Sequence, residues 1–128
     1  MKLNHDCVRS LLLFLEETLS MNKPLDLRTV ELVGFDNDET VYAAMKLVEA
    51  GFLAGTVREY GMGDPPLVVV SQITWEGHKF LDTIRDNNVW GKTKKVLSKV
   101  SSASLSFTAT VASQILSSVI SQYLTTNP

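Results

Sequence analysis

The chain has 128 residues, of which 45% are hydrophobic and 20% are charged, and its formal net charge is −2. This composition predicts one globular domain that buries a core without a metal, with room for a C-terminal extension, and the single Cys7 excludes an internal disulfide. The small negative charge gives no global attraction to nucleic acid or anionic membrane, and the polar N-terminus lacks the pattern of a signal peptide, so we expect a cytoplasmic protein.

The first helix is predicted close to the N-terminus. Asp6 is a candidate N-cap, because a carboxylate there accepts hydrogen bonds from the free backbone N–H groups that begin a helix. Apolar residues then recur at helical spacing and predict one buried face, consisting of Val8, Leu11, Leu12, Leu15 and Leu19. Pro24 disfavours helical backbone in the residue before it, so we expect the helix to end near residues 22–24.

Residues 25–35 fit two kinds of structure. Leu25 and Leu27 alternate with charged residues as in a short strand, whereas Leu27, Val30 and Val33 could form one or two helical turns. We expect a short strand followed by a short second helix, with a turn at Gly34.

A third helix is predicted to begin at Asp36 and to end before Gly51. Asp36 and Glu39 have the spacing of a capping box, and glycine suits the position just after a helix. The predicted core-facing residues are Val41, Ala44, Met45 and Val48, and the predicted outward-facing residues are Glu39, Ala43, Lys46 and Glu49.

A hairpin and a further helical region follow. Strands are predicted at about residues 53–60 and 67–73, with a flexible tip at 61–66 that is too long for a two-residue turn. Thr74 is the predicted cap of a helix whose buried face is Gly77, Phe80, Leu81 and Ile84. Residues 86–88 are expected to break this helix before helical spacing resumes as far as Val100.

This order predicts an α+β fold of the winged helix-turn-helix class, with three helices, a β-hairpin wing and a C-terminal helical extension. We assign residues 1–100 to the winged-helix domain and residues 101–128 to the extension.

The extension carries no Asp, Glu, Lys or Arg, since the last charged side chain is Lys99. We expect one amphipathic helix at about residues 105–124. Its apolar seam has coiled-coil-like spacing and consists of Leu105, Ala109, Ala112, Leu116, Val119 and Tyr123. The helix has three possible roles: self-association, packing on its own domain, or membrane insertion. The absence of charge on its polar face favours self-association over the other two, and membrane insertion is the least favoured.

The sequence indicates no catalytic or metal site. His5, Asp6 and Cys7 are adjacent, but neighbouring side chains point in different directions and do not form a nucleophile–base pair by proximity alone. His78 is isolated, and no metal-ligand cluster or phosphate-binding glycine loop is present. We therefore expect a protein without enzymatic activity, cofactor or metal.

A winged helix commonly reads DNA with its third helix, but the charges here disfavour that role. Residues 36–50 carry four acids and one lysine, and the wing adds only Arg58, beside Glu59 and Asp64. We expect this face to bind a protein instead, with Tyr42, Tyr60 and Met62 as exposed contacts.

Positive charge is concentrated further along the chain. Lys92, Lys94, Lys95 and Lys99 could contact phosphate, an anionic lipid or the acidic helix of a second copy. A DNA-binding regulator that contacts phosphates through these lysines is therefore the alternative function.

Three segments of the chain resemble a small winged-helix family associated with phages and prophages, similar in layout to YjcQ-like proteins. They are residues 1–9, residues 47–53 and residues 73–82, the last of which contains Thr74, Glu76 and Gly77. The resemblance implies a bacterial mobile-element protein of winged-helix fold with no catalytic residues. We therefore expect a non-enzymatic interaction module that forms a homo-oligomer through its C-terminal helix and binds a host or phage protein.

Overall fold

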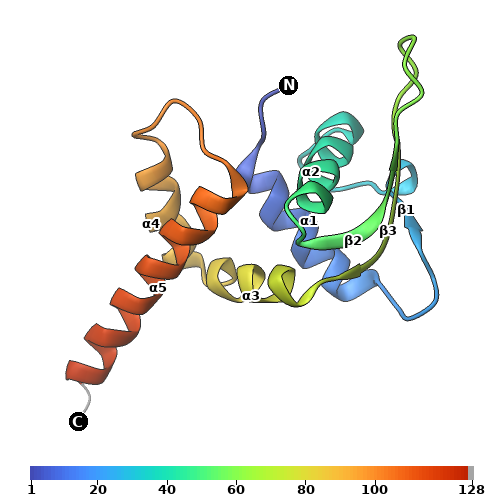
Figure 1. Ribbon diagram of the computed structural model, residues 1–128. Coiled ribbons are helices and arrows are strands. Elements are labelled where there is room, and N and C mark those ends of the chain that lie inside the picture. The colour runs from blue at the N-terminus through green and yellow to red at the C-terminus, as the bar shows by residue number, and fades with distance from the viewer. Residues whose placement is uncertain (127–128) are drawn as a thin grey trace. The chain divides into compact units, whose positions relative to one another are not determined.

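The computed structural model describes residues 1–126. Over this range the chain is a mixed α+β protein with five α-helices, one short 3₁₀ helix and a small antiparallel sheet of three strands (Figure 1). It divides into two compact units, unit 1 (Met1–His78) and unit 2 (Lys79–Pro128). The domain boundary that the sequence analysis placed after residue 100 stays a prediction. Helices α4 and α5, which are described below and lie before and after that residue, belong to the same unit.

Helix α1 (His5–Thr18) has its N-cap two residues before the predicted one. The N-cap is Asn4, whose backbone is extended and whose side-chain oxygen accepts a hydrogen bond from the Cys7 N–H at 3.1 Å. The prediction of Asp6 was wrong because Asp6 lies inside the first turn, where its carboxylate still interacts favourably with the helix dipole. The buried residues of α1 are Cys7, Val8, Leu11, Leu12 and Leu15.

The segment after α1 contains both structures between which the sequence was ambiguous. Strand β1 (Leu25–Asp26) is followed directly by the 3₁₀ helix η1 (Leu27–Thr29), for which Asp26 is the N-cap. Leu27 is fully buried and Val30 nearly so, and these two residues anchor the segment in the core.

Helix α2 (Asn37–Glu49) has the predicted cap. The Asp36 side chain accepts a hydrogen bond from the Glu39 N–H at 2.8 Å. The buried face is rotated from the predicted one and consists of Thr40, Val41, Ala43, Ala44 and Leu47. The outward prediction for Ala43 was therefore wrong: Ala43 lies one turn before Leu47, on the same face as that fully buried leucine.

Strands β2 (Leu53–Arg58) and β3 (Leu67–Ile73) form a hairpin, and β3 also pairs with β1, so that the strand order is β1-β3-β2. Val68 and Val70 of β3 are fully buried, in keeping with the two-residue period of a strand. The register shifts once, between Ala54 and Gly55. The loop that joins the strands extends well beyond the paired residues (Figure 1).

Hydrogen bonds join the residues before β2 to the residue that links β3 to α3 (Trp75–Ile84). The Thr74 hydroxyl donates to the Gly51 carbonyl at 2.6 Å, and the Thr74 N–H donates to the Phe52 carbonyl at 3.1 Å. The same hydroxyl accepts from the Gly77 N–H at 3.0 Å, which confirms Thr74 as the predicted cap. At Gly77 a Cβ atom would collide with the Phe52 carbonyl oxygen.

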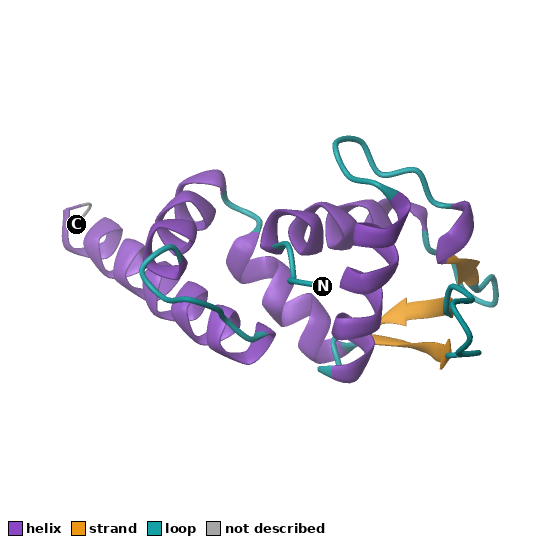
Figure 2. Ribbon diagram, turned by 90° about the horizontal axis from the view of Figure 1, so that it is seen from above, coloured by secondary structure: helices purple, strands orange, loops and turns teal. Residues whose placement is uncertain are grey.

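Unit 2 contains helices α4 (Asn87–Leu97) and α5 (Leu105–Thr126), which pack side by side. The break predicted near residues 86–88 is confirmed, since α3 ends at Ile84 and Asp86 caps α4 by accepting from the Val89 N–H at 3.0 Å. Figure 2 shows both helices as continuous ribbons. The most buried residues of the pair are Val89, Trp90 and Thr93 of α4 and Leu105, Thr108, Val111 and Ala112 of α5.

Substitution of the two helical glycines should have opposite effects on stability. Gly77→Ala should lower the free energy of unfolding by about 1–3 kcal/mol, because the new methyl group overlaps the Phe52 carbonyl and lies 2.8 Å from Ile73 Cγ2. Gly91→Ala in α4 has no atom within 4 Å of the new methyl and should raise stability by about 0.5–1 kcal/mol. Urea denaturation followed by circular dichroism measures both, and a Gly77→Ala protein as stable as Gly91→Ala would contradict the close contact.

Candidate functional site

One candidate surface in unit 1 lies between α2 and the loop that joins β2 to β3; we call it the α2–wing surface. It encloses a cavity of about 320 Å³, lined by Tyr42 and Met45 of α2, by Pro65 and Pro66 of the loop, and by Arg28, among others. Tyr42, which the sequence predicted as an exposed contact, is half-buried and lines this cavity. The lining is thus largely apolar, as is common for binding sites.

The other two predicted contacts lie at the tip of the loop. Met62 is 99% exposed and Tyr60 is 55% exposed, and neither lines the cavity. The tip turns sharply: Gly61, Met62 and Gly63 all have positive φ, and the Asp64 N–H donates to the Gly61 carbonyl at 2.9 Å. A methionine in this conformation is unusual, and its side chain is almost completely accessible to a partner.

Arg28, which lines the cavity, and Lys46 of α2 are each paired with an acid. Lys46 Nζ lies 2.8 Å from Glu49 Oε2 and 5.4 Å from the centroid of the Tyr42 ring, and the hydrogen bond to Glu49 raises the pKa of Lys46. Arg28 Nη2 lies 2.7 Å from Asp26 Oδ2, and the hydrogen bonds from Arg28 lower the pKa of Asp26. A phosphate would have to compete with these carboxylates for both cations.

The charges of the chain are divided unequally between the two units. Residues 1–78 contain six cationic and twelve acidic side chains, a net charge of −6, whereas residues 79–128 contain six cationic and two acidic side chains, a net charge of +4. The predicted phosphate contacts Lys92, Lys94 and Lys95 are exposed on α4, and Lys99 is exposed two residues beyond its end. Lys94 and Lys95 also stabilise the C-terminal end of α4 through the helix dipole, which gives them a structural role.

The residues of the predicted oligomerisation seam of α5 differ in solvent exposure along the helix. Leu105 and Ala112 are buried within the monomer, and Ala109, Leu116 and Val119 are half-buried. Tyr123 is 64% exposed, and Ile120 and Leu124 beside it are also exposed. Only the C-terminal end of the seam is therefore open to a second copy. Among the described residues, no helix has the combined length and hydrophobicity needed to cross a lipid bilayer.

The most nucleophilic group of the chain is kept inactive by burial. Cys7 is fully buried, and its burial raises the pKa of the thiol from 9.0 to about 11, with Glu39 and Asp36 raising it further and a hydrogen bond to Thr40 opposing them. At neutral pH the thiol is protonated, whereas the thiolate is the reactive form. Within residues 1–126, no group of three or more His, Cys, Asp or Glu side chains is placed to hold a metal ion.

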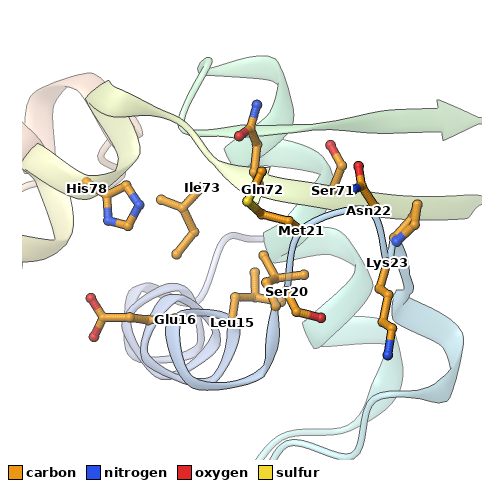
Figure 3. Close-up of a pocket in the computed structure, with 12 residues that line it drawn as sticks. Leu15, Glu16, Ser20, Met21, Asn22, Lys23, Ser71, Gln72, Ile73 and His78 are labelled. Carbon is orange, nitrogen blue, oxygen red and sulfur yellow. The ribbon is translucent and has the colours of Figure 1, made fainter.

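The sequence did not indicate a second candidate cavity in unit 1. It has a volume of about 620 Å³ and lies between the end of α1, the segment 19–24 and the last residues of β3 (Figure 3). His78, which the sequence left as an isolated histidine, lies at one end of this cavity. Pro24, which cannot donate a hydrogen bond to a neighbouring strand, was a signal available in the sequence, whereas the 89% exposure of Met21 is known only from the structure.

Comparison with known proteins shows one family and one relative. The family model described as "Hypothetical protein (DUF2513)" matches residues 2–104. An uncharacterized protein of Haemophilus influenzae (strain ATCC 51907 / DSM 11121 / KW20 / Rd) is 32% identical over 124 residues, which cover 97% of this chain and 99% of that protein. No solved structure matches the chain.

The buried thiol predicts a specific dependence of stability on pH. Because the pKa of Cys7 is higher in the folded protein than its ordinary value of 9.0, its contribution to stability is fully present below pH 9 and is lost as the pH rises toward 11. We expect the free energy of unfolding of the wild type to fall more steeply over this interval than that of Cys7→Ala. Urea denaturation at several pH values measures the difference, and parallel pH profiles for the two proteins would contradict a buried thiol.

Proposed function

We propose that this chain, which belongs to the DUF2513 family, is a non-enzymatic protein-interaction module of winged-helix fold that self-associates through α5. The order of its elements supports the fold, since a helix, a short strand, two further helical segments and a hairpin follow one another in α1, β1, η1, α2, β2 and β3. The central position of β3 between β1 and β2 also fits a winged helix, with the loop between β2 and β3 as the wing.

The charge of unit 1 is the observation on which the preference for a protein partner depends. DNA-binding proteins gain most of their affinity from cations that neutralise phosphates. Unit 1 instead carries twice as many acids as cations, and Lys46 and Arg28 beside its cavity are already paired. The exposed Tyr60 and Met62 together with the apolar lining at Tyr42 suit contact with a protein.

Self-association through α5 is supported by its exposed apolar end. Ile120, Tyr123 and Leu124 have large apolar side chains in contact with solvent, and no charged side chain on the helix opposes close approach of a second copy. Association through α5 would cover all three.

The proposal also includes the origin and location of the protein. We propose that it is encoded by a bacterial mobile element and acts in the host cytoplasm on a host or phage protein. The support for this is the resemblance of residues 1–9, 47–53 and 73–82 to phage-associated winged-helix proteins, together with the bacterial source of the relative described above.

Charge introduced at the exposed end of α5 should dissociate the oligomer. In the double variant Ile120→Glu, Leu124→Glu, two carboxylates one helical turn apart would be buried in the interface, which is unfavourable. We expect the mass of the full-length protein, measured by light scattering, to fall to that of a monomer.

The matched control is Gln114→Glu, Ser118→Glu, which has the same spacing and the same added charge on the opposite, exposed face of α5. It should retain the oligomer. A monomeric wild type, or equal masses for both variants, would reject the role of α5.

Duplex DNA binding through unit 2 is the second candidate, because its net charge of +4 is concentrated in exposed lysines of α4. By helical spacing Lys92 and Lys95 lie on one side of α4, from which they could contact neighbouring phosphates.

A titration of the full-length protein on duplex DNA at about 50 and 200 mM salt separates the two functions. We expect no binding at either concentration, because the net charge of −6 on unit 1 outweighs the +4 of unit 2. Binding that weakens by several orders of magnitude between the two concentrations, as phosphate contacts require, would favour the DNA function. In that case Lys95→Ala should weaken binding, and Lys23→Ala in unit 1 should not.

A further inference from the structure

The sheet of unit 1 has an uncovered edge. Strand β1 pairs with β3 only at Val69 and Val70, and Pro24, just before β1, cannot donate a ladder hydrogen bond. The chain before Pro24 turns away in a short bend closed by a bridge between Ser20 and Lys23. Residues 71–73 of β3 therefore have β2 on one side and no strand on the other, within the part of the chain that the structure describes.

The backbone of Ile73 has the orientation that strand addition needs. The Thr74 N–H donates to the Phe52 carbonyl on the β2 side. Consecutive residues of a strand direct their polar groups to opposite edges, so the N–H and C=O of Ile73 face the uncovered edge.

The cavity of about 620 Å³ lies along this edge, and we call it the β3-edge groove. Its accessible apolar lining includes the half-buried Leu19 and the exposed Met21, with Leu15 and Ile73 buried beneath (Figure 3). A groove with an apolar lining and a free strand edge fits an extended peptide, which pairs through its main chain and seats alternate side chains on that lining.

The charged residues of the groove define the chemistry of that peptide. Glu16 and His78 lie at one end and Lys23 at the other (Figure 3). Glu16 belongs to the last turn of α1, where the helix dipole is also negative. A cationic side chain is therefore favoured at the Glu16 end, and an acidic one at the Lys23 end.

We propose that the β3-edge groove binds an extended segment of a partner protein as an additional strand on β3. An aliphatic side chain of this segment packs on Leu19 and Met21, a lysine or arginine lies next to Glu16, and an acidic residue lies next to Lys23. The inference goes beyond the proposed function, because this groove is separate from both the α2–wing surface and α5.

Selection from a phage-displayed library of random eight-residue peptides on the immobilised full-length protein tests the proposal. We expect enriched peptides with an aliphatic residue and a cationic residue in an alternating pattern. Synthetic copies should bind Glu16→Lys at least tenfold more weakly than wild type. Glu17→Lys is the matched control, because it makes the same charge change on the neighbouring residue outside the groove, and it should bind within twofold of wild type.

Two further measurements separate strand addition from other modes of binding. N-methylation of the peptide at successive positions should abolish binding at every second position, and peptide should slow hydrogen exchange of the Ile73 amide. Lys23→Glu, a second variant, should weaken binding of peptides that carry an acidic residue. The absence of enriched peptides, equal affinity for Glu16→Lys and Glu17→Lys, or no effect at Ile73 would each overturn the proposal. If excess unlabelled protein displaced the peptide from this groove, the occupant would be a second copy of the chain. That result would also overturn the proposal.

Discussion

The junction of Thr74 and Gly77 with Gly51 and Phe52 is the contact on which the rest of unit 1 depends. One threonine caps α3, donates through its hydroxyl to Gly51 and pairs through its backbone with Phe52, so the end of α2 and the start of α3 are held at a fixed separation. Only a glycine at position 77 permits this approach. The hairpin between these fixed ends places its connecting loop beside α2, and the short β1 covers only part of β3.

The two units differ in net charge. The acidic unit 1 surrounds its cavities with carboxylates that are partly paired with its own cations, whereas the basic unit 2 combines exposed lysines on α4 with an uncharged α5. Net positive charge is therefore confined to unit 2, and Met62 and the end of α5 expose apolar surface that carries no charge.

Sequence reasoning succeeded where a structure is determined by neighbouring residues. The caps Asp36 and Thr74 and the break at Asp86 were predictable because each side chain accepts a hydrogen bond from the N–H three residues later. It failed at the start of α1, where Asn4 and Asp6 are both able to cap the helix and Asn4 does so. The β3-edge groove was equally hidden, since it depends on where the pairing of β1 with β3 stops.

The central claim is that this protein works through protein contacts at the end of α5 and on unit 1, with α2 not reading DNA. Hydrogen exchange of the full-length protein at low and high concentration tests it most directly. The account predicts that protection increases with concentration at residues 116–124 of α5, and that added duplex DNA protects no residue of α2. Protection of α2 by DNA, with no concentration dependence in α5, would contradict the account.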